Sequence, residues 1–310
     1  VYPSPRHATA PGWQSRLLNR LLPLFPYKRR LVSAAALHAR LREIASSLPD
    51  GAPVGLGSDV EATRQHDQGW PTYIVAPAAA PSAAHHVVFL HGGGYFEEIA
   101  RPHWRFVGRL AREVPARCVV PIFPRVPHTC AHELVPAMGR FIGGFIGKVG
   151  PECVTIVGNS SGAGLGLAAA QWLRDHGLPQ PRALVLVSPW LDAAINGADQ
   201  AEIALRDPLQ AIPGLIEAGR LYAGTLDITH PYVSPLNGDL RGLAPMTVFT
   251  GTRDLLHPNS HRLARAAQRD GVDVALHCAQ DLPHNYALLP TPEGAEAREI
   301  IVRVVRQAAK

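Results

Sequence analysis

The sequence predicts an α/β fold whose core is a mostly parallel sheet of eight strands, with helices on both faces and a helical cap. Two observations lead to this prediction. Short apolar segments alternate with longer segments of helical periodicity over most of the 310-residue chain, which is typical of βαβ units. Several short segments, such as 87–90 and 184–187, are apolar throughout, as expected for central strands buried on both faces.

The composition is that of a globular protein, with 46% hydrophobic and 18% charged residues. The chain is long enough for one large α/β domain with insertions. Its net charge is +5, but the arginines are scattered and only residues 28–30 form a basic run, so we expect no nucleic acid partner. No apolar segment approaches the roughly 20 residues of a membrane span, and the first residues lack the pattern of a signal peptide.

Residues 1–50 are expected to be helical. Apolar residues recur at helical spacing over 13–22, and Pro23 then ends the pattern. A second helix is expected at 33–47, with Leu37, Leu41 and Ile44 on one face. We expect these helices to cover a site on the main body, as the first part of the cap.

Strands and helices alternate from position 53 onward. The expected strands are 54–63, 73–76, 86–90, 118–123, 154–158, 183–188, 246–251 and 272–277. The expected helices are 103–114, 133–148, 163–176, 258–269 and 293–309. The segment between the sixth and seventh strands is too long for a single crossover helix. We therefore expect a core of residues 51–188 and 243–310, with a cap built from 1–50 and the insertion 189–242.

The four cysteines show no Cys-x-x-Cys spacing. Cys118, Cys153 and Cys278 lie in or beside expected strands, which predicts buried free thiols. Free thiols favour a cytoplasmic location. We expect no metal site, because the histidine pairs have no carboxylate at a suitable spacing. These pairs are His85 with His86 and His128 with His132.

A Gly-x-Ser-x-Gly pattern at residues 158–162 lies between an expected strand and an expected helix. This context is that of a nucleophile elbow, which holds a serine hydroxyl at the top of a sheet. The dipole of the following helix favours negative charge there. A side chain at Gly158 or Gly162 would collide with the neighbouring strand or helix. The pattern predicts Ser160 as a nucleophile, with an ordinary glycine- and serine-rich turn as the alternative.

Three consecutive glycines, Gly92, Gly93 and Gly94, follow the expected strand 86–90 and His91. Glycines let backbone N–H groups point at one spot without obstruction by side chains, and an oxyanion hole requires such donors. The alternatives are a flexible turn and a phosphate-binding loop. The phosphate alternative lacks a Gly-x-Gly-x-x-Gly pattern and a following Lys-Ser/Thr pair.

A carboxylate and an imidazole follow two later strands. Asp254 comes just after the expected strand 246–251, and His284 follows the strand 272–277. Because the carboxyl ends of parallel strands meet at one edge of a sheet, both side chains are expected near Ser160. The chain order Ser, Asp, His is that of an α/β-hydrolase-type triad. Order and position together predict a catalytic triad, although each residue alone is equally compatible with a structural role.

Several motifs in this order resemble the hormone-sensitive-lipase-like branch of the α/β-hydrolases. They are His91-Gly92-Gly93-Gly94, Gly158-Asn159-Ser160-Ser161-Gly162, Ser188-Pro189-Trp190-Leu191-Asp192, Ser234-Pro235-Leu236, Gly251-Thr252-Arg253-Asp254 and Pro283-His284. The resemblance spans residues 50–310 and implies an α/β-hydrolase fold. It also implies an esterase that acts on carboxylic esters without a cofactor or metal, under a variable helical cap.

Position by position, the resemblance implies a role for each motif residue. Ser160 matches the nucleophile, Asp254 the acid and His284 the base. The residues matching the oxyanion donors are Gly93, Gly94 and Ser161, and those expected to support them are His91, Gly92 and Asn159.

Three departures from the family pattern concern pH dependence and substrate fit. Asn159-Ser160-Ser161 replaces the usual Asp-Ser-Ala, which removes a charge and adds a hydroxyl. His257 stands where the family often has a second acid. The stretch 123–128 matches the usual Tyr-Arg-Leu-Ala-Pro-Glu-His only loosely.

The sequence therefore predicts a serine carboxylesterase that hydrolyses short- to medium-chain esters through an acyl-enzyme intermediate. Two alternatives remain: a non-catalytic ligand-binding member of the same fold, and an acyltransferase or amidase that uses the same triad. The expected partner is a small-molecule ester, and the apolar cap could make weak contact with lipid. The expected assembly is a monomer or a homodimer.

Overall fold

The protein is described from a computed structural model that covers residues 10–45, 51–67, 69–79 and 84–308. Parts of three sequence predictions lie outside these residues. They are the first nine residues of the cap segment 1–50, the end of the helix expected at 33–47, and the last residue of the helix expected at 293–309.

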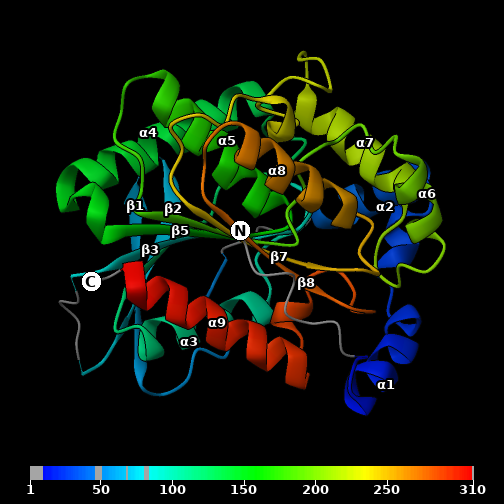
Figure 1. Cartoon of the computed structure of the whole chain (residues 1–310), viewed down its shortest axis with the longest axis horizontal. Helices are drawn as coiled ribbons and strands as arrows, with labels where there is room; N and C mark the ends of the chain where they lie inside the picture. Colours follow the sequence, from blue (N-terminus) through cyan, green and yellow to red (C-terminus); the bar gives the residue numbers. More distant parts are fainter. Residues whose placement is uncertain (1–9, 46–50, 68, 80–83, 309–310) are drawn as a thin grey trace.

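The described residues form an eight-stranded sheet in the order β1-β2-β4-β3-β5-β6-β7-β8 (Figure 1). The strands are β1 Val60–Asp67, β2 Trp70–Pro77, β3 His86–Leu90, β4 Arg117–Pro121, β5 Val154–Asn159, β6 Ala183–Val187, β7 Met246–Gly251 and β8 Val274–Ala279. Strand β2 is antiparallel to both β1 and β4, and the remaining neighbours pair in parallel. The predicted fold class, an α/β fold on a mostly parallel sheet, is confirmed.

Helices cover both faces of the sheet (Figure 1). One face has α4 Ala131–Val149, α5 Ser161–Asp175 and α8 His257–Arg269, and the other has α3 Arg101–Glu113 and α9 Pro292–Ala308. The central strand β3 contributes to both cores, because successive side chains point to opposite faces. Val88 and Leu90 pack with residues of α4 and α5, whereas Val87 and Phe89 pack with residues of α3 and α9.

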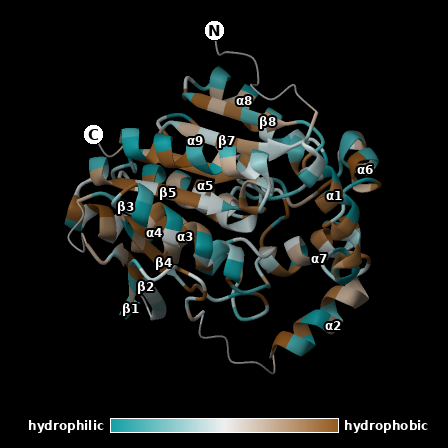
Figure 2. Cartoon of the chain, turned by 90° about the horizontal axis from the view of Figure 1, so that it is seen from below, coloured by the Kyte–Doolittle hydropathy of each residue, from teal (hydrophilic) through white to brown (hydrophobic). Residues whose placement is uncertain are grey.

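A further group of helices lies at one end of the sheet (Figures 1 and 2). It consists of the 3-10 helix η2 Lys28–Leu31 with α2 Ala34–Ala45, α6 Ala198–Ala204 and α7 Ile212–Ala223. We call this group the helical layer. Its parts come from the start of the chain and from the segment between β6 and β7, and α7 packs directly against α2 and η2. Helix α1 Trp13–Leu21 instead contacts α9, where the N–H of Gly12 donates to Glu293 at 2.5 Å.

Four strand predictions differ from the structure by one to three residues at their ends, and two more are displaced along the chain. Strand β1 begins at Val60 rather than at 54, because Gly55 and Gly57 have φ angles of 78° and 107° that an extended strand does not accommodate. Strand β8 covers Val274–Ala279, two residues later than the predicted 272–277. Helices α6 and α7 were expected only as an insertion without assigned elements.

The cysteine prediction was partly wrong. All four cysteines are free, and Cys118 is buried on β4. However, Cys153 and Cys278 are half-buried. Cys153 closes a short 3-10 helix, η3 Pro151–Cys153, and Cys278 lies on β8 at the edge of the sheet, where fewer elements cover it. Among the helices of the described residues, none has the length and apolar character needed to cross a bilayer.

Candidate active site

The turn after β5 holds Ser160 in an unusual backbone conformation. Its φ and ψ angles are 54° and −124°, a region that few non-glycine residues occupy. The turn is tight: a Cβ on Gly158 would lie 2.7 Å from the carbonyl oxygen of Gly162, and one on Gly162 would collide with the carbonyl of Leu90. These two glycines let α5 start directly after β5, so Ser160 lies at the carboxyl end of a central strand, as the pattern predicted.

The structure brings Ser160, His284 and Asp254 together in one hydrogen-bonded chain. Nδ1 of His284 lies 2.9 Å from Oδ2 of Asp254, and Nε2 lies 2.9 Å from Oγ of Ser160. Because an ionised carboxylate only accepts hydrogen bonds, Nδ1 donates to Asp254 and Nε2 of the neutral ring accepts from the serine hydroxyl. This tautomer is the one that a base acting on Ser160 requires.

All three side chains are buried, and Asp254 is completely so. Burial by itself would lower the pKa of His284, but the charge and hydrogen bond of Asp254, together with the charge of Asp207, outweigh burial and raise it above the usual 6.5. A raised pKa means that the imidazolium form is stabilised, which is the form that results when His284 takes a proton.

The glycines of the 92–94 loop face Ser160. Gly93 and Gly94 have φ angles of 140° and 60°, which favour glycine. The Gly93 carbonyl accepts hydrogen bonds from the N–H groups of Phe96 and Glu97. Within the described part of the chain, the N–H groups of Gly93 and Gly94 have no hydrogen-bond partner, and both residues line the same cavity as Ser160. They are free to bind a ligand oxygen.

Asn159 and His91 hold this loop against the elbow. The N–H of Gly92 donates to Oδ1 of Asn159 at 2.9 Å. The His91 ring stacks on Phe123 with centroids 4.5 Å apart, and its Nδ1 lies 2.9 Å from the Gly92 carbonyl. Burial lowers the pKa of His91 to about 4, so the ring is neutral and Nδ1–H donates to that carbonyl. Both residues thus contact the loop and not the cavity.

The two adjacent serines have different surroundings. Ser161 is the first residue of α5, where backbone N–H groups have no partner inside the helix. Its side chain is buried, and its Oγ accepts a hydrogen bond from the N–H of Tyr95 at 3.3 Å. Only the hydroxyl of Ser160 meets the imidazole of His284.

Comparisons with known proteins identify the family of this chain. A family model described as the alpha/beta hydrolase fold matches residues 87–288. The chain belongs to the α/β-hydrolase family. It is 32% identical over 227 residues to an acetyl-hydrolase of Streptomyces hygroscopicus, with 72% of this chain and 75% of that protein aligned. It is 33% identical to a triacylglycerol lipase of Mycobacterium tuberculosis, over 71% of this chain but only 46% of the lipase.

Solved structures place this hydrolase in the same branch as the motifs did. The crystal structure of an esterase from the bacterial hormone-sensitive lipase family superposes with a TM-score of 0.80 and 26% identity, over 97% of this chain and all of that one. The hydrolase therefore belongs to the hormone-sensitive-lipase-like branch of esterases and lipases, as its motifs predicted.

A cavity of about 440 Å³ in this hydrolase opens onto Ser160 and His284. Its walls come from the sheet edge, from the 92–94 loop and from both parts of the helical layer. The apolar side chains that line it are Leu22, Leu31, Phe96, Leu209, Leu215, Leu288 and Leu289. This volume lies at the lower end of the range for small-molecule sites.

The sequence analysis missed two polar residues of the site, Asp207 and Gln210. Asp207 is buried, and its Oδ2 accepts a hydrogen bond from the N–H of Leu255 at 2.8 Å. With its NH2 group turned toward the two carboxylates, Gln210 donates to Oδ1 of Asp254 and Oδ2 of Asp207, both at 3.1 Å. Burial and the neighbouring charge of Asp254 raise the pKa of Asp207 to about 6.

No local pattern identifies Asp207 or Gln210 in the sequence. Both lie in the segment between β6 and β7, which was expected only as an insertion. The one available signal was the Asp-Pro pair at 207–208, which is typical of a turn and carries no indication of catalysis.

Proposed function

We propose that this hydrolase cleaves short- to medium-chain carboxylic esters through an acyl-enzyme intermediate on Ser160. The observation that carries the proposal is the unbroken hydrogen-bonded chain from Asp254 through His284 to Ser160. The cavity supplies a place where an ester carbonyl can approach the Ser160 hydroxyl.

In the first half of the reaction, Ser160 Oγ attacks the ester carbonyl carbon while Nε2 of His284 takes the hydroxyl proton. Asp254 keeps the imidazole in the tautomer that accepts at Nε2, and it stabilises the imidazolium that forms. When the tetrahedral intermediate collapses, the bond to the alcohol oxygen breaks. The proton on Nε2 then passes to that oxygen, and the alcohol departs.

The oxygen of the tetrahedral intermediate becomes negatively charged and needs donors that are already in place. We assign this role to the N–H groups of Gly93, Gly94 and Ser161. The first two are free of intramolecular partners among the described residues, and the third lies at a helix N-terminus, where the dipole favours an anion. In the second half, His284 activates water, which attacks the acyl carbon and releases the acid and Ser160.

The size and lining of the cavity support a substrate with a short to medium acyl chain. Its lining is mostly apolar and its volume is about 440 Å³, so an acyl chain of modest length can be enclosed. A series of p-nitrophenyl esters of increasing chain length should give the highest kcat/KM below about twelve carbons, and a maximum above that length would overturn this part of the proposal.

We further propose that residues 1–50 and 189–242 act as one cap over the site. Leu22 and Leu31 from the first segment, and Leu209 and Leu215 from the second, line the cavity together. Several large apolar side chains of the first segment are exposed to solvent, among them Trp13, Leu17, Leu24 and Phe25. Such a surface suits weak contact with lipid, and co-flotation with neutral vesicles, lost in Trp13→Ser/Leu17→Ser, would test it.

The decisive experiment is labelling with a fluorophosphonate probe followed by peptide mapping. The expected adduct is on Ser160, absent in Ser160→Ala and present in Ser161→Ala, which is the matched control. Absence of an adduct on the folded wild-type protein would overturn the mechanism and favour the non-catalytic alternative. Release of ester products rather than acid in the presence of an added alcohol would favour an acyltransferase instead.

A further inference from the structure

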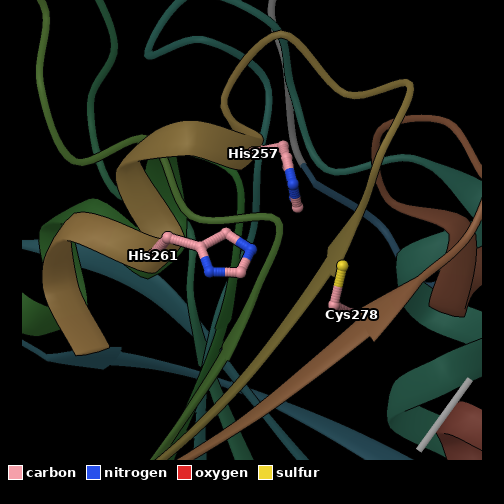
Figure 3. A group of neighbouring side chains, drawn as sticks. All are labelled: His257, His261 and Cys278. Atoms are coloured by element: carbon pink, nitrogen blue, oxygen red, sulfur yellow. The ribbon is translucent and has the colours of Figure 1, made fainter. Parts of the chain in front are cut away.

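Two histidines and a cysteine converge on the edge of the sheet beside the catalytic acid (Figure 3). His257 and His261 are one helical turn apart at the start of α8, and Cys278 lies on the adjacent strand β8. One candidate ligand atom from each residue lies within 4.8 Å of the other two. All three side chains are half-buried, so a small ion can reach them from solvent.

The cluster has the ligand chemistry of a zinc site. Imidazole nitrogen and thiolate sulfur are preferred ligands of Zn²⁺, and histidines four residues apart on a helix can bind one ion together. The candidate ligand atoms lie within 4.8 Å of one another, so binding a tetrahedral ion would require the side chains to rotate closer together. Three protein ligands leave the fourth tetrahedral position to water.

Other polar contacts of the cluster are few. Thr250 Oγ1 lies 3.3 Å from Nδ1 of His257 and restrains that ring, and Thr250 is the β7 residue that pairs with Cys278. Among the described residues, neither the His261 ring nor the Cys278 thiol has a hydrogen-bond partner, so neither must break a hydrogen bond to become a ligand.

We propose that His257, His261 and Cys278 bind a zinc ion, and that the bound ion lowers the hydrolase activity. The second part rests on the proposed triad mechanism. The N–H of His257 donates to the carbonyl of Asp254 at 2.9 Å, so the cluster begins one turn after the catalytic acid. On binding, the Cys278 thiol becomes a zinc-bound thiolate and releases one proton.

The expected inhibition follows from charge. The zinc ion with its thiolate ligand adds a net positive charge next to Asp254, and this charge competes with the His284 imidazolium for the carboxylate that stabilises it. His284 then becomes a weaker base toward Ser160, and the transition state in which it is protonated is less stable. Zn²⁺ should therefore lower kcat/KM of the wild type by about tenfold or more.

A second group of potential ligands provides the control. Cys130, His132 and Glu133 lie within ligand distance of one another at the start of α4, but His132 and Glu133 are exposed. A Cys130→Ser/His132→Gln variant removes this group and leaves the proposed site intact. Titration of that variant with Co²⁺ should give one ion per chain and a thiolate-to-cobalt absorption band.

The Cys278→Ser variant should lose that band, and His261→Gln should bind Co²⁺ at least about tenfold more weakly. Metal-free activity should be retained in both variants, whereas inhibition by Zn²⁺ should be lost. Absence of Co²⁺ binding to the wild type, or a band that persists in Cys278→Ser, would overturn the site. Equal inhibition of the wild type and His261→Gln by Zn²⁺ would overturn the proposed effect of the bound ion on activity. Failure of the triad mechanism would be seen instead as absence of fluorophosphonate labelling.

Discussion

Asp207 accepts a hydrogen bond from the N–H of Leu255, the residue that directly follows Asp254, at 2.8 Å. The two residues are 48 positions apart in the chain and belong to the insertion and to the core. With Gln210 between the carboxylates of Asp207 and Asp254, the insertion is in direct contact with Asp254. The insertion therefore does more than line the cavity: it contributes a charge that acts on His284.

Asp207→Asn should shift the acid limb of the kcat/KM profile to lower pH. The charge of Asp207 helps to raise the pKa of His284, and hydrolysis requires neutral His284. Removing that charge lowers the pKa, so the base stays neutral to lower pH. The measurement is kcat/KM against pH with a soluble ester. The control is Asp199→Asn, which replaces an exposed carboxylate of the same insertion and should not shift the acid limb of the kcat/KM profile.

Replacement of Ser160 should reduce kcat more than replacement of Asp254, because Ser160 forms the bond to the substrate and Asp254 positions His284. Ser160→Ala should reduce kcat by about 10⁶-fold, and Asp254→Asn by about 10⁴-fold because the asparagine favours the wrong imidazole tautomer. Pre-steady-state and steady-state hydrolysis of an activated ester measure both. If kcat of Ser161→Ala were reduced as much as kcat of Ser160→Ala, the assignment of the nucleophile would be wrong.

Glu97→Gln should weaken catalysis and stability together. Glu97 follows the 92–94 loop, and its carboxylate accepts hydrogen bonds from Nε and Nη2 of Arg40 on α2 at 2.7 and 2.8 Å. Loss of this charged pair should lower the free energy of unfolding by about 1–3 kcal/mol. It should lower kcat by about tenfold, because the N–H of Glu97 also holds the Gly93 carbonyl.

Glu43→Gln is the matched control for that pair. Glu43 also bonds Arg40, at 3.0 Å, but its side chain is largely exposed. Exposed ion pairs contribute little to stability. This variant should therefore have nearly the wild-type free energy of unfolding, measured by denaturant unfolding, and nearly the wild-type kcat. An equal loss of stability and kcat in Glu43→Gln and Glu97→Gln would refute the special role of Glu97.

Asn159→Ala should lower kcat by about tenfold to a hundredfold, because the buried N–H of Gly92 then has no acceptor. Asn159→Asp keeps the acceptor and should retain activity. Nδ1 of His103 accepts from the N–H of Ala100, so the ring proton is on Nε2, which lies 3.3 Å from the amide nitrogen of Asn159.

An aspartate at position 159 accepts from that Nε2–H and should raise the pKa of His103, which burial holds at about 3. NMR titration of the His103 ring in the two proteins measures this change. An unchanged His103 pKa, or activity of Asn159→Asp as low as that of Asn159→Ala, would contradict the predicted contacts.

The sequence by itself determined most of the sheet of this hydrolase and the turn after β5 that holds Ser160. Strands β3 and β7 were predicted with their observed bounds, because a continuous apolar run between polar turns defines a buried strand locally. The proximity of Ser160, Asp254 and His284 could be predicted because each follows a parallel strand, and topology brings those strand ends to one edge. Their catalytic roles stay a prediction.

Only the tertiary structure decided which side chains meet across segments without such a pattern. The contacts of Asp207 with Leu255, of Arg40 with Glu97 and of Cys278 with the two α8 histidines join residues from separate elements. Local periodicity indicates which face of a helix is apolar, but it does not indicate which polar group another segment will place against it. Those pairings depend on how the helical layer packs on the finished sheet, and packing is a property of the whole chain.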